Sequence, residues 1–165
     1  QEEVKQEEVK QEEVKQEEEE KIKNLVKDVE YLSTDQNGNK YKILATSAKS
    51  NLDDNNVLDL INVRGVITSD KRLPIYIVSD FANYNSSNQN SKFYQNVIIK
   101  HMDKIITCDN FDVDMETSMA VAYNNVVVTD PKSIMKAGEI TFDLKTKDVN
   151  INPESKKTKV EVITN

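Results

Sequence analysis

The segment Ile43-Leu44-Ala45-Thr46-Ser47-Ala48 is the first of four related segments, and their repetition decides the fold. Each copy presents a small residue and, three positions later, another apolar residue. The later copies are Ile77-Val78-Ser79-x-x-Ala82, Ile106-Thr107-Cys108-x-x-Phe111 and Met135-Lys136-Ala137-x-x-Ile140, at offsets of 34, 29 and 29 residues. Such a short unit cannot bury its apolar face alone, so neighbouring units are expected to stack and share one core.

A second motif follows each of the first three copies. It is the pair Asn-Val, found at Asn62-Val63, Asn96-Val97 and Asn125-Val126, with offsets of 34 and 29 residues that match the first motif. One repeat unit is therefore two strands, and successive units place their strands edge to edge.

Apolar and polar residues alternate with a period of two from Tyr31 onward, which is typical of half-buried strands. Asn37-Gly38 is a strong hairpin signal. Many short strands at regular spacing, without a long amphipathic helix between them, predict an all-β sandwich, roll or barrel. The expected strands lie near residues 41–48, 57–68, 74–82, 92–101, 104–114, 118–129, 134–144, 148–152 and 158–163.

If the small residues Ala45, Ser79, Cys108 and Ala137 fall in register, the inner wall loses volume along one line. The facing parts of the sheet then either close into a filled core or leave a groove for an acyl chain, and the pattern leaves both interpretations open. The residues predicted to line this interior are Ile43, Ala45, Leu60, Val63, Ile77, Ser79, Ala82, Tyr84, Phe93, Val97, Ile99, Ile106, Cys108, Phe111, Val113, Val121, Tyr123, Val126, Val128, Ala137, Ile140, Phe142 and Leu144.

The first 30 residues have a different character from the rest of the 165-residue chain. Residues 1–15 are three copies of Gln-Glu-Glu-Val-Lys, and residues 1–20 carry the whole net charge of −7. The repeated Val residues are about 140° apart on a helix, so they form no coiled-coil seam. We expect residues 1–30 to be a charged helical or disordered spacer, with a short helix over residues 22–29, and residues 31–165 to be the β domain.

Composition excludes several classes of protein. The longest apolar run is Met119 to Tyr123, far short of the ~20 residues of a membrane-spanning helix. One Cys rules out a disulfide framework, and one His makes His-dependent catalysis and His-rich metal sites improbable. The 19 acidic and 19 basic residues after residue 20 cancel, which argues against a nucleic-acid-binding surface. We therefore expect no catalytic residues, cofactor or metal.

Other reactive residues have structural interpretations. Asp109, Asp112, Asp114 and Glu116 alternate with apolar residues, so we expect the solvent face of a strand rather than paired catalytic carboxylates or a calcium loop. His101 is expected to be exposed at a strand end, and Cys108 to be a buried small hydrophobe. The turn charges Lys71-Arg72 and Lys156-Lys157 could contact phosphates at the mouth of the interior.

The order and spacing of several motifs resemble the periplasmic domain of the LptC family over nearly all of residues 28–152. The first motif is Asp28-x-Glu30-Tyr31, followed by Asp35-x-x-Gly38-Asn39-x-Tyr41-x-Ile43-x-Ala45. The others are Leu60-x-Asn62-Val63, Ser79-Asp80-x-Ala82-x-Tyr84-Asn85, Phe93-x-x-Asn96-Val97, Asn124-Asn125-Val126, Ala137-Gly138-Glu139-Ile140 and Leu144-Lys145-Thr146-Lys147.

This resemblance implies a twisted, slightly open antiparallel β-jellyroll and a non-enzymatic role in lipopolysaccharide export in Gram-negative bacteria. Such a protein accepts lipopolysaccharide from an inner-membrane ABC transporter and passes it to an LptA-type protein through strand-edge pairing. It also implies a periplasmic location and an N-terminal membrane anchor that is absent from this chain. Two alternatives remain: a soluble LptA-like bridge component, or a structural or protein-binding β-roll with a filled core.

Overall fold

A computed structural model describes residues 25–153 and the strand formed by residues 161–164. The described residues form ten strands in one antiparallel sheet, in the order β1-β2-β3-β4-β5-β6-β7-β8-β10, with β9 paired to β8 beside β10. The strands are β1 (Val26–Thr34), β2 (Lys40–Ser50), β3 (Val57–Ser69), β4 (Arg72–Asn85), β5 (Ser91–His101), β6 (Lys104–Asp114), β7 (Met119–Thr129), β8 (Ser133–Asp143), β9 (Val149–Asn152) and β10 (Glu161–Thr164).

The predicted all-β class and its antiparallel hairpins are confirmed. The start of the sheet differs from the prediction, because β1 begins at Val26 and a helix expected over residues 22–29 is therefore wrong for residues 26–29. In β1, Val29 and Tyr31 pack against the core, and the strand pairs along its length with β2. The spacer expected over residues 1–24 lies outside the described residues.

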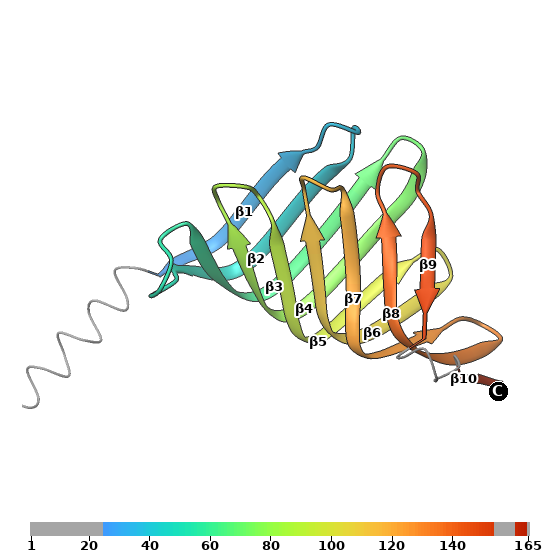
Figure 1. Ribbon diagram of the computed structural model, residues 1–165. Coiled ribbons are helices and arrows are strands. Elements are labelled where there is room, and N and C mark those ends of the chain that lie inside the picture. Colours follow the sequence, from blue (N-terminus) through green and yellow to red (C-terminus); the bar gives the residue numbers. More distant parts are fainter. Residues whose placement is uncertain (1–24, 154–160, 165) are drawn as a thin grey trace, which may run out of the picture.

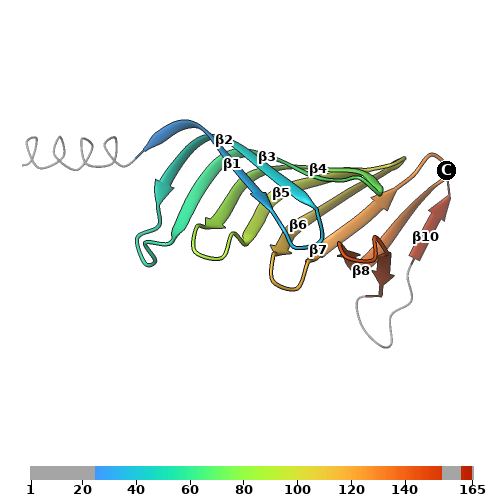
Figure 2. The same ribbon diagram turned by 90° about the horizontal axis from the view of Figure 1, so that it is seen from above.

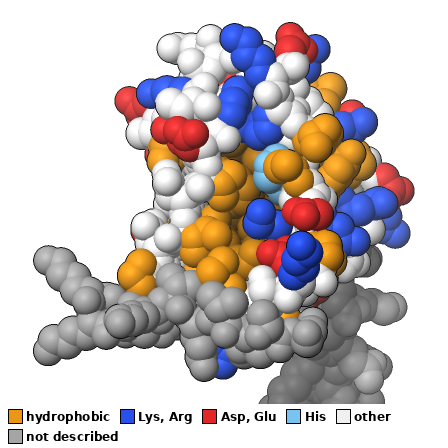
Figure 3. Space-filling model, turned by 90° about the vertical axis from the view of Figure 1, so that its right-hand side faces the viewer, with side chains coloured by type: hydrophobic (Ala, Val, Ile, Leu, Met, Phe, Trp, Pro, Cys, Tyr) orange, Lys and Arg blue, Asp and Glu red, His pale blue; other side chains and the backbone are white. Residues whose placement is uncertain are grey.

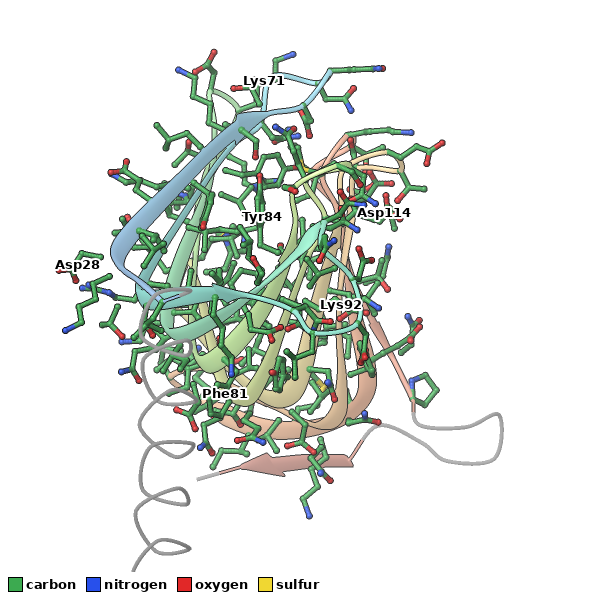
Figure 4. All side chains as sticks on the ribbon, turned by 90° about the vertical axis from the view of Figure 1, so that its left-hand side faces the viewer. Asp28, Lys71, Phe81, Tyr84, Lys92 and Asp114 are labelled. Atoms are coloured by element: carbon green, nitrogen blue, oxygen red, sulfur yellow. The ribbon has the colours of Figure 1, made fainter. Side chains whose placement is uncertain are left out.

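The sheet is bent near the middle of its strands, so that it folds over on itself into two leaves (Figure 1). The strands follow one another along the length of this roll from β1 to β10 (Figure 2). Seen from the β1 end, the strands curve around an interior that contains Tyr84, whereas Asp28 projects outward (Figure 4). The roll therefore has a packed interior, two ends, and a seam where the leaf edges meet.

The bend explains the spacing of three in the repeated motif. In a regular strand, residues three apart face opposite sides of the sheet. Here both members of each motif are buried, because the alternation of inward and outward residues shifts by one position at the bend. The buried pairs are Ala45 and Ala48, Ser79 and Ala82, Cys108 and Phe111, and Ala137 and Ile140. The repeat found in the sequence is thus the device that keeps one face inward on both leaves.

The Asn-Val motif lies at the same bend, in the strands β3, β5 and β7 that alternate with the strands of the first motif. Asn62, Asn96 and Asn125 all have positive φ, between 53° and 55°. Asn accepts this left-handed conformation more readily than most residues with a side chain. Each amide Nδ2 also donates to the residue that follows the small residue of the neighbouring strand, at 3.3 Å to Thr46, 2.6 Å to Asp80 and 2.5 Å to Asp109.

The small residues of the repeated motif lie at the same height along their strands, in line across the sheet, as the sequence predicted. Ala45 pairs with Val63, which pairs with Ser79, and farther along Val97 pairs with Cys108 and Val126 with Ala137. The Ser79 hydroxyl donates to the carbonyl of Phe81 at 2.9 Å, which satisfies a backbone oxygen at the bend. Small side chains fit here because this level is the inner corner of the fold.

Gly65 has a related role between the two leaves. A Cβ at this position would lie 3.3 Å from the Phe93 ring and 3.4 Å from Ile77. The absent side chain is therefore what lets the Phe93 ring reach across the interior and fill it.

The bend generates a prediction at Asn96. Replacing Asn96 with Gly and with Val removes the same hydrogen bond to Asp80, but only Val is strained at φ 53°. We expect Asn96→Val to be less stable than Asn96→Gly by about 1–3 kcal/mol in urea unfolding. Lys100→Val, on the outer face of the same strand, should change stability by less than about 0.5 kcal/mol. Equal stabilities of the two Asn96 variants would contradict the role assigned to the left-handed residue.

Candidate functional site

The predicted lining residues, apart from Val121 and Tyr123, are buried in one core inside the roll. The largest of them form a chain of aromatic contacts, with ring centroids 6.2 Å apart for Phe93 and Phe111 and 5.9 Å apart for Phe111 and Phe142. Their position in the interior was correctly predicted from the alternation and the repeat.

Val121 and Tyr123 face outward, contrary to the prediction. Strand β7 has two consecutive left-handed residues, Asn124 and Asn125, at its bend. Its inward positions on either side of the bend are therefore four apart, at Ala122 and Val126, rather than three. The Tyr123 hydroxyl instead donates to Asp112 Oδ2 on the outer face at 3.0 Å. In β7 the prediction missed the inward residues Ala120 and Ala122, and elsewhere in the core it omitted Tyr41, Ala48, Ile67 and Ile75.

The middle of the interior is filled. The space bounded by Ile43, Gly65, Ile77 and Phe93 has a volume of only about 10 Å³, roughly that needed for one water molecule. An acyl chain does not fit there in this conformation. Of the two interpretations of the small-residue line, the closed one describes this part of the roll.

The end of the roll at β1 is closed by two aromatic rings. Tyr31 of β1 and Tyr84 of β4 come from opposite leaves and stack with centroids 4.7 Å apart. Burial raises the pKa of both hydroxyls, and the neighbouring Tyr31 adds to the shift at Tyr84. These side chains therefore remain neutral and act as a plug between the leaves.

The seam between the leaves is held by a polar cluster, which we call the clasp: Asp35, Asn37, Asn39, Tyr41 and Ser118. Asn37 Nδ2 donates to Ser118 Oγ at 2.9 Å, and Asn39 Nδ2 donates to the Leu144 carbonyl at 2.9 Å. These bonds join the β1–β2 turn of one leaf to loops of the other. Asn39 is fully buried, so its amide has no access to water and depends on these partners.

Asp35 organises the clasp. Its carboxylate accepts from the Asn37 and Asn39 backbone N–H groups, Asn39 Nδ2, the Tyr41 hydroxyl and the Ser118 hydroxyl, at 2.8–3.3 Å. Burial alone would raise the pKa of Asp35, but the hydrogen bonds from Asn39, Tyr41 and Asn37 outweigh it and lower the pKa. The sequence analysis identified Asp35-x-x-Gly38-Asn39-x-Tyr41 as a hairpin and as part of a family-like motif, but it predicted none of these side-chain contacts.

Among the residues that the structure describes, the other end of the roll is open. A cleft of about 450 Å³ lies between the ends of β4, β5, β6, β7, β8 and β9, and Figure 3 shows its apolar interior bordered by Lys and Arg side chains. Its apolar lining consists of Leu73, Met102, Ile106, Val128, Ile140, Val149 and Ile151. Its volume falls within the ~300–1,000 Å³ typical of small-molecule sites. Three of the predicted lining residues, Ile106, Val128 and Ile140, lie in the wall of this cleft.

Four cations border the cleft: Lys71, Arg72, Lys104 and Lys147. Arg72 Nη2 and Lys147 Nζ both donate to the same oxygen, Asn39 Oδ1, at 3.3 and 2.8 Å. Lys147 also donates to the Leu144 carbonyl at 2.6 Å and has a φ of 71°, which Gly or Asn adopts more easily. The turn charges Lys71 and Arg72 were recognised in the sequence, whereas Lys147 was not assigned a role.

His101 is buried in the wall of the cleft, contrary to the prediction that it is exposed. Its Nδ1 lies 3.3 Å from the Pro74 carbonyl, and its ring meets Phe142 edge-on with centroids 6.1 Å apart. The end of β5 is covered by neighbouring parts of the roll, which the position in sequence did not reveal. Cys108 is buried as predicted, and burial raises the pKa of its thiol to about 12, so it is unreactive.

The acidic residues near the β6–β7 hairpin serve local structure. Asp109 accepts from Asn125, Asp112 accepts from Tyr123, and Asp114 accepts from the backbone N–H groups of the next turn. Within residues 25–153, no group of three or more His, Cys, Asp or Glu side chains could hold a metal ion. In the same part of the chain, no helix is long and apolar enough to cross a membrane.

Comparison with protein families gives a match over residues 3–158 to the family described as lipopolysaccharide-assembly, LptC-related. A comparison with curated protein sequences found no match.

Among solved structures, the roll is similar to LptH of Pseudomonas aeruginosa, described as the LptA-homologous periplasmic component of the lipopolysaccharide transport device. The two chains are 11% identical, with a TM-score of 0.51 over 74% of this chain and 93% of LptH. At this identity the likeness establishes a shared LptA-like fold.

The clasp generates a prediction about stability and pH. Because the pKa of Asp35 is lowered by folding, its ionised form stabilises the fold above the ordinary carboxyl pKa of about 4, and this contribution is lost as the pH falls through the lowered value. We expect Asp35→Asn to reduce the free energy of unfolding by about 1–3 kcal/mol at pH 7, with a smaller difference from wild type below pH ~4. Asp70→Asn, in the exposed β3–β4 turn, is the control, and a pH-independent loss at Asp35 would contradict the prediction.

Proposed function

The chain belongs to the LptC-related lipopolysaccharide-assembly family, and from that premise we propose that it is a non-enzymatic lipopolysaccharide carrier. It receives lipopolysaccharide from an inner-membrane ABC transporter and passes it to the next β-jellyroll of a periplasmic bridge. The energy comes from ATP hydrolysis in the transporter, so the roll needs only to bind and release. A membrane anchor outside the described residues would hold it at the inner membrane.

The open cleft is the observation that carries this proposal. Lipopolysaccharide combines acyl chains with phosphorylated sugars, and the cleft combines an apolar floor with a rim of four cations. Removing acyl surface from water favours binding by roughly 25 cal/mol per Å². The arrangement lets acyl chains lie on Ile106, Val128 and Ile140 while the charged headgroup stays at the rim, in contact with water.

Passage through the roll requires the leaves to separate, because the middle of the interior is filled. The clasp is the polar contact that holds the seam there, and it is built from hydrogen bonds rather than apolar packing. We infer that the predicted lining residues beyond the cleft contact acyl chains only when this seam opens.

The strand edges provide the surfaces for assembly. In the described part of the chain, β1 pairs on one side only, with β2, and β9 and β10 lie at the opposite edge. Val26 and Leu32 of β1 are exposed apolar residues, 58% and 67% accessible. An unpaired apolar edge invites addition of another strand, so each edge is a candidate for the LptA-type partner or the transporter.

A second candidate is a structural or protein-binding roll that carries no lipid. The filled middle of the interior favours it. A soluble LptA-like bridge component is a further form of the lipid-carrier proposal, supported by the likeness of the fold to LptH.

Photo-crosslinking in cells that make lipopolysaccharide tests the proposal. A photoreactive residue replaces Leu73, which lines the cleft and is 59% exposed, or Tyr76, which is 53% exposed on the outer face of the same strand. We expect a lipopolysaccharide adduct at position 73 and none at position 76, since only the former borders the apolar floor. A roll without lipid would give no adduct at either position, and equal adducts at both would indicate nonspecific contact.

A further inference from the structure

We propose that Arg72 and Lys147 together form a binding site for a phosphate monoester on an acylated lipid, seated on the cleft side of these two cations, which converge on the Asn39 side-chain oxygen. This inference rests on the proposed function and specifies which headgroup chemistry the cleft selects. It assigns the selection to two residues from separate elements, the start of β4 and the turn between β8 and β9.

The geometry of the shared oxygen defines the position. Arg72 Nη2 lies 3.3 Å and Lys147 Nζ 2.8 Å from Asn39 Oδ1, so two positive groups converge on one neutral acceptor. A phosphate on the cleft side of the two cations would accept from their remaining N–H donors and carry the negative charge that the Asn39 amide lacks. Charge-assisted bonds of this kind are about twice as strong as neutral ones.

The two cations have unused binding capacity. Arg72 Nε is buried and has no hydrogen-bond partner. Within residues 25–153, the one ion pair within 4.0 Å joins Lys42 to Glu30, so neither Arg72 nor Lys147 is paired with a carboxylate. Burial lowers the pKa of Arg72, and burial together with the nearby Arg72 lowers the pKa of Lys147. The site therefore holds two positive charges that are partly removed from water. A bound anion would compensate these charges.

Asp35 is the carboxylate that acts on both cations, and its oxygens already accept hydrogen bonds. It attracts both cations electrostatically without forming an ion pair with either. Its lone pairs are directed to the clasp donors of the β1–β2 turn and to Ser118. The carboxylate thus positions Asn39, while the outer sides of Arg72 and Lys147 remain at the cleft.

The chemistry and the surroundings point to a monoester on a lipid. The planar guanidinium of Arg72 binds two phosphate oxygens at once, and the ammonium of Lys147 adds a compact charge. Lys71 and Lys104 lie on the same rim, and the floor beside them is apolar. A free phosphate ion would use the cations but gain nothing from the floor, whereas a lipid phosphate uses both.

Binding of two lipids with the same palmitoyl chain tests the site. Calorimetry below the micelle concentration compares 1-palmitoyl-lysophosphatidic acid, which carries a phosphate monoester, with 1-palmitoylglycerol, which does not. We expect the wild-type chain to bind the phosphorylated lipid ~10–100-fold more tightly. Arg72→Gln/Lys147→Gln should lose this preference, because it removes both positive charges that face the phosphate.

Two further variants serve as controls. Lys49→Gln/Lys92→Gln removes the same charge from exposed positions outside the cleft and should keep the wild-type preference. Arg72→Lys/Lys147→Arg retains both charges and should keep most of it. Circular dichroism checks that each variant is folded.

Each result bears on a different claim. Equal binding of the two lipids by wild type, or a preference that survives in Arg72→Gln/Lys147→Gln, would overturn the phosphate site and leave the lipid-carrier proposal standing. Inorganic phosphate that competes as strongly as the phosphorylated lipid would overturn the assignment to a lipid headgroup. Wild type that binds neither lipid would overturn both proposals.

Discussion

The structure depends on one constraint: each strand must present its apolar side to the same interior before and after a sharp bend. A regular strand cannot do so with its residues in strict alternation. The chain meets the constraint with a motif spacing of three in β2, β4, β6 and β8 and with left-handed Asn residues in β3, β5 and β7. The sheet can then fold into two leaves, and the core, the seam and the ends all follow from that fold.

The two ends of the roll differ, and this asymmetry gives the molecule a direction. A stack of Tyr31 on Tyr84 closes the end at β1, whereas the end at β8 and β9 opens into a cleft with an apolar floor and a cationic rim. Between them, the clasp ties one leaf to the other through buried hydrogen bonds. The clasp also reaches the rim, because Asn39 bonds to Arg72 and Lys147. The proposed headgroup site and the closure of the seam thus share one residue, Asn39.

Much of this fold could be predicted from the sequence, because alternation and the repeat are local patterns with direct physical meaning. The strands over residues 40–152 and most of the core were predictable in this way. The errors arose where the direction of a side chain depends on the backbone conformation at the bend, which the alternation of residues does not reveal. Val121 and Tyr123 were misplaced because β7 has two consecutive left-handed residues at its bend, which set its inward positions four apart.

The clasp and the cleft could not be predicted because their residues are distant in the sequence. Asn39 meets Leu144 and Lys147 only after the sheet has folded over, at separations of 105 and 108 residues. A charged residue such as Lys147 has no periodic signal that marks it as part of a rim. The burial of His101 likewise depends on neighbours that the alternation of β5 alone does not specify.

The central claim is that lipid enters the roll through the cleft at its open end. Methyl NMR of isoleucine-labelled protein titrated with lipopolysaccharide tests it directly. We expect the signals of Ile106, Ile140 and Ile151, which line the cleft, to shift first. The signals of Ile98 and Ile105, exposed on the outer face, should remain unchanged. Shifts confined to the outer isoleucines, or none at all, would contradict the account.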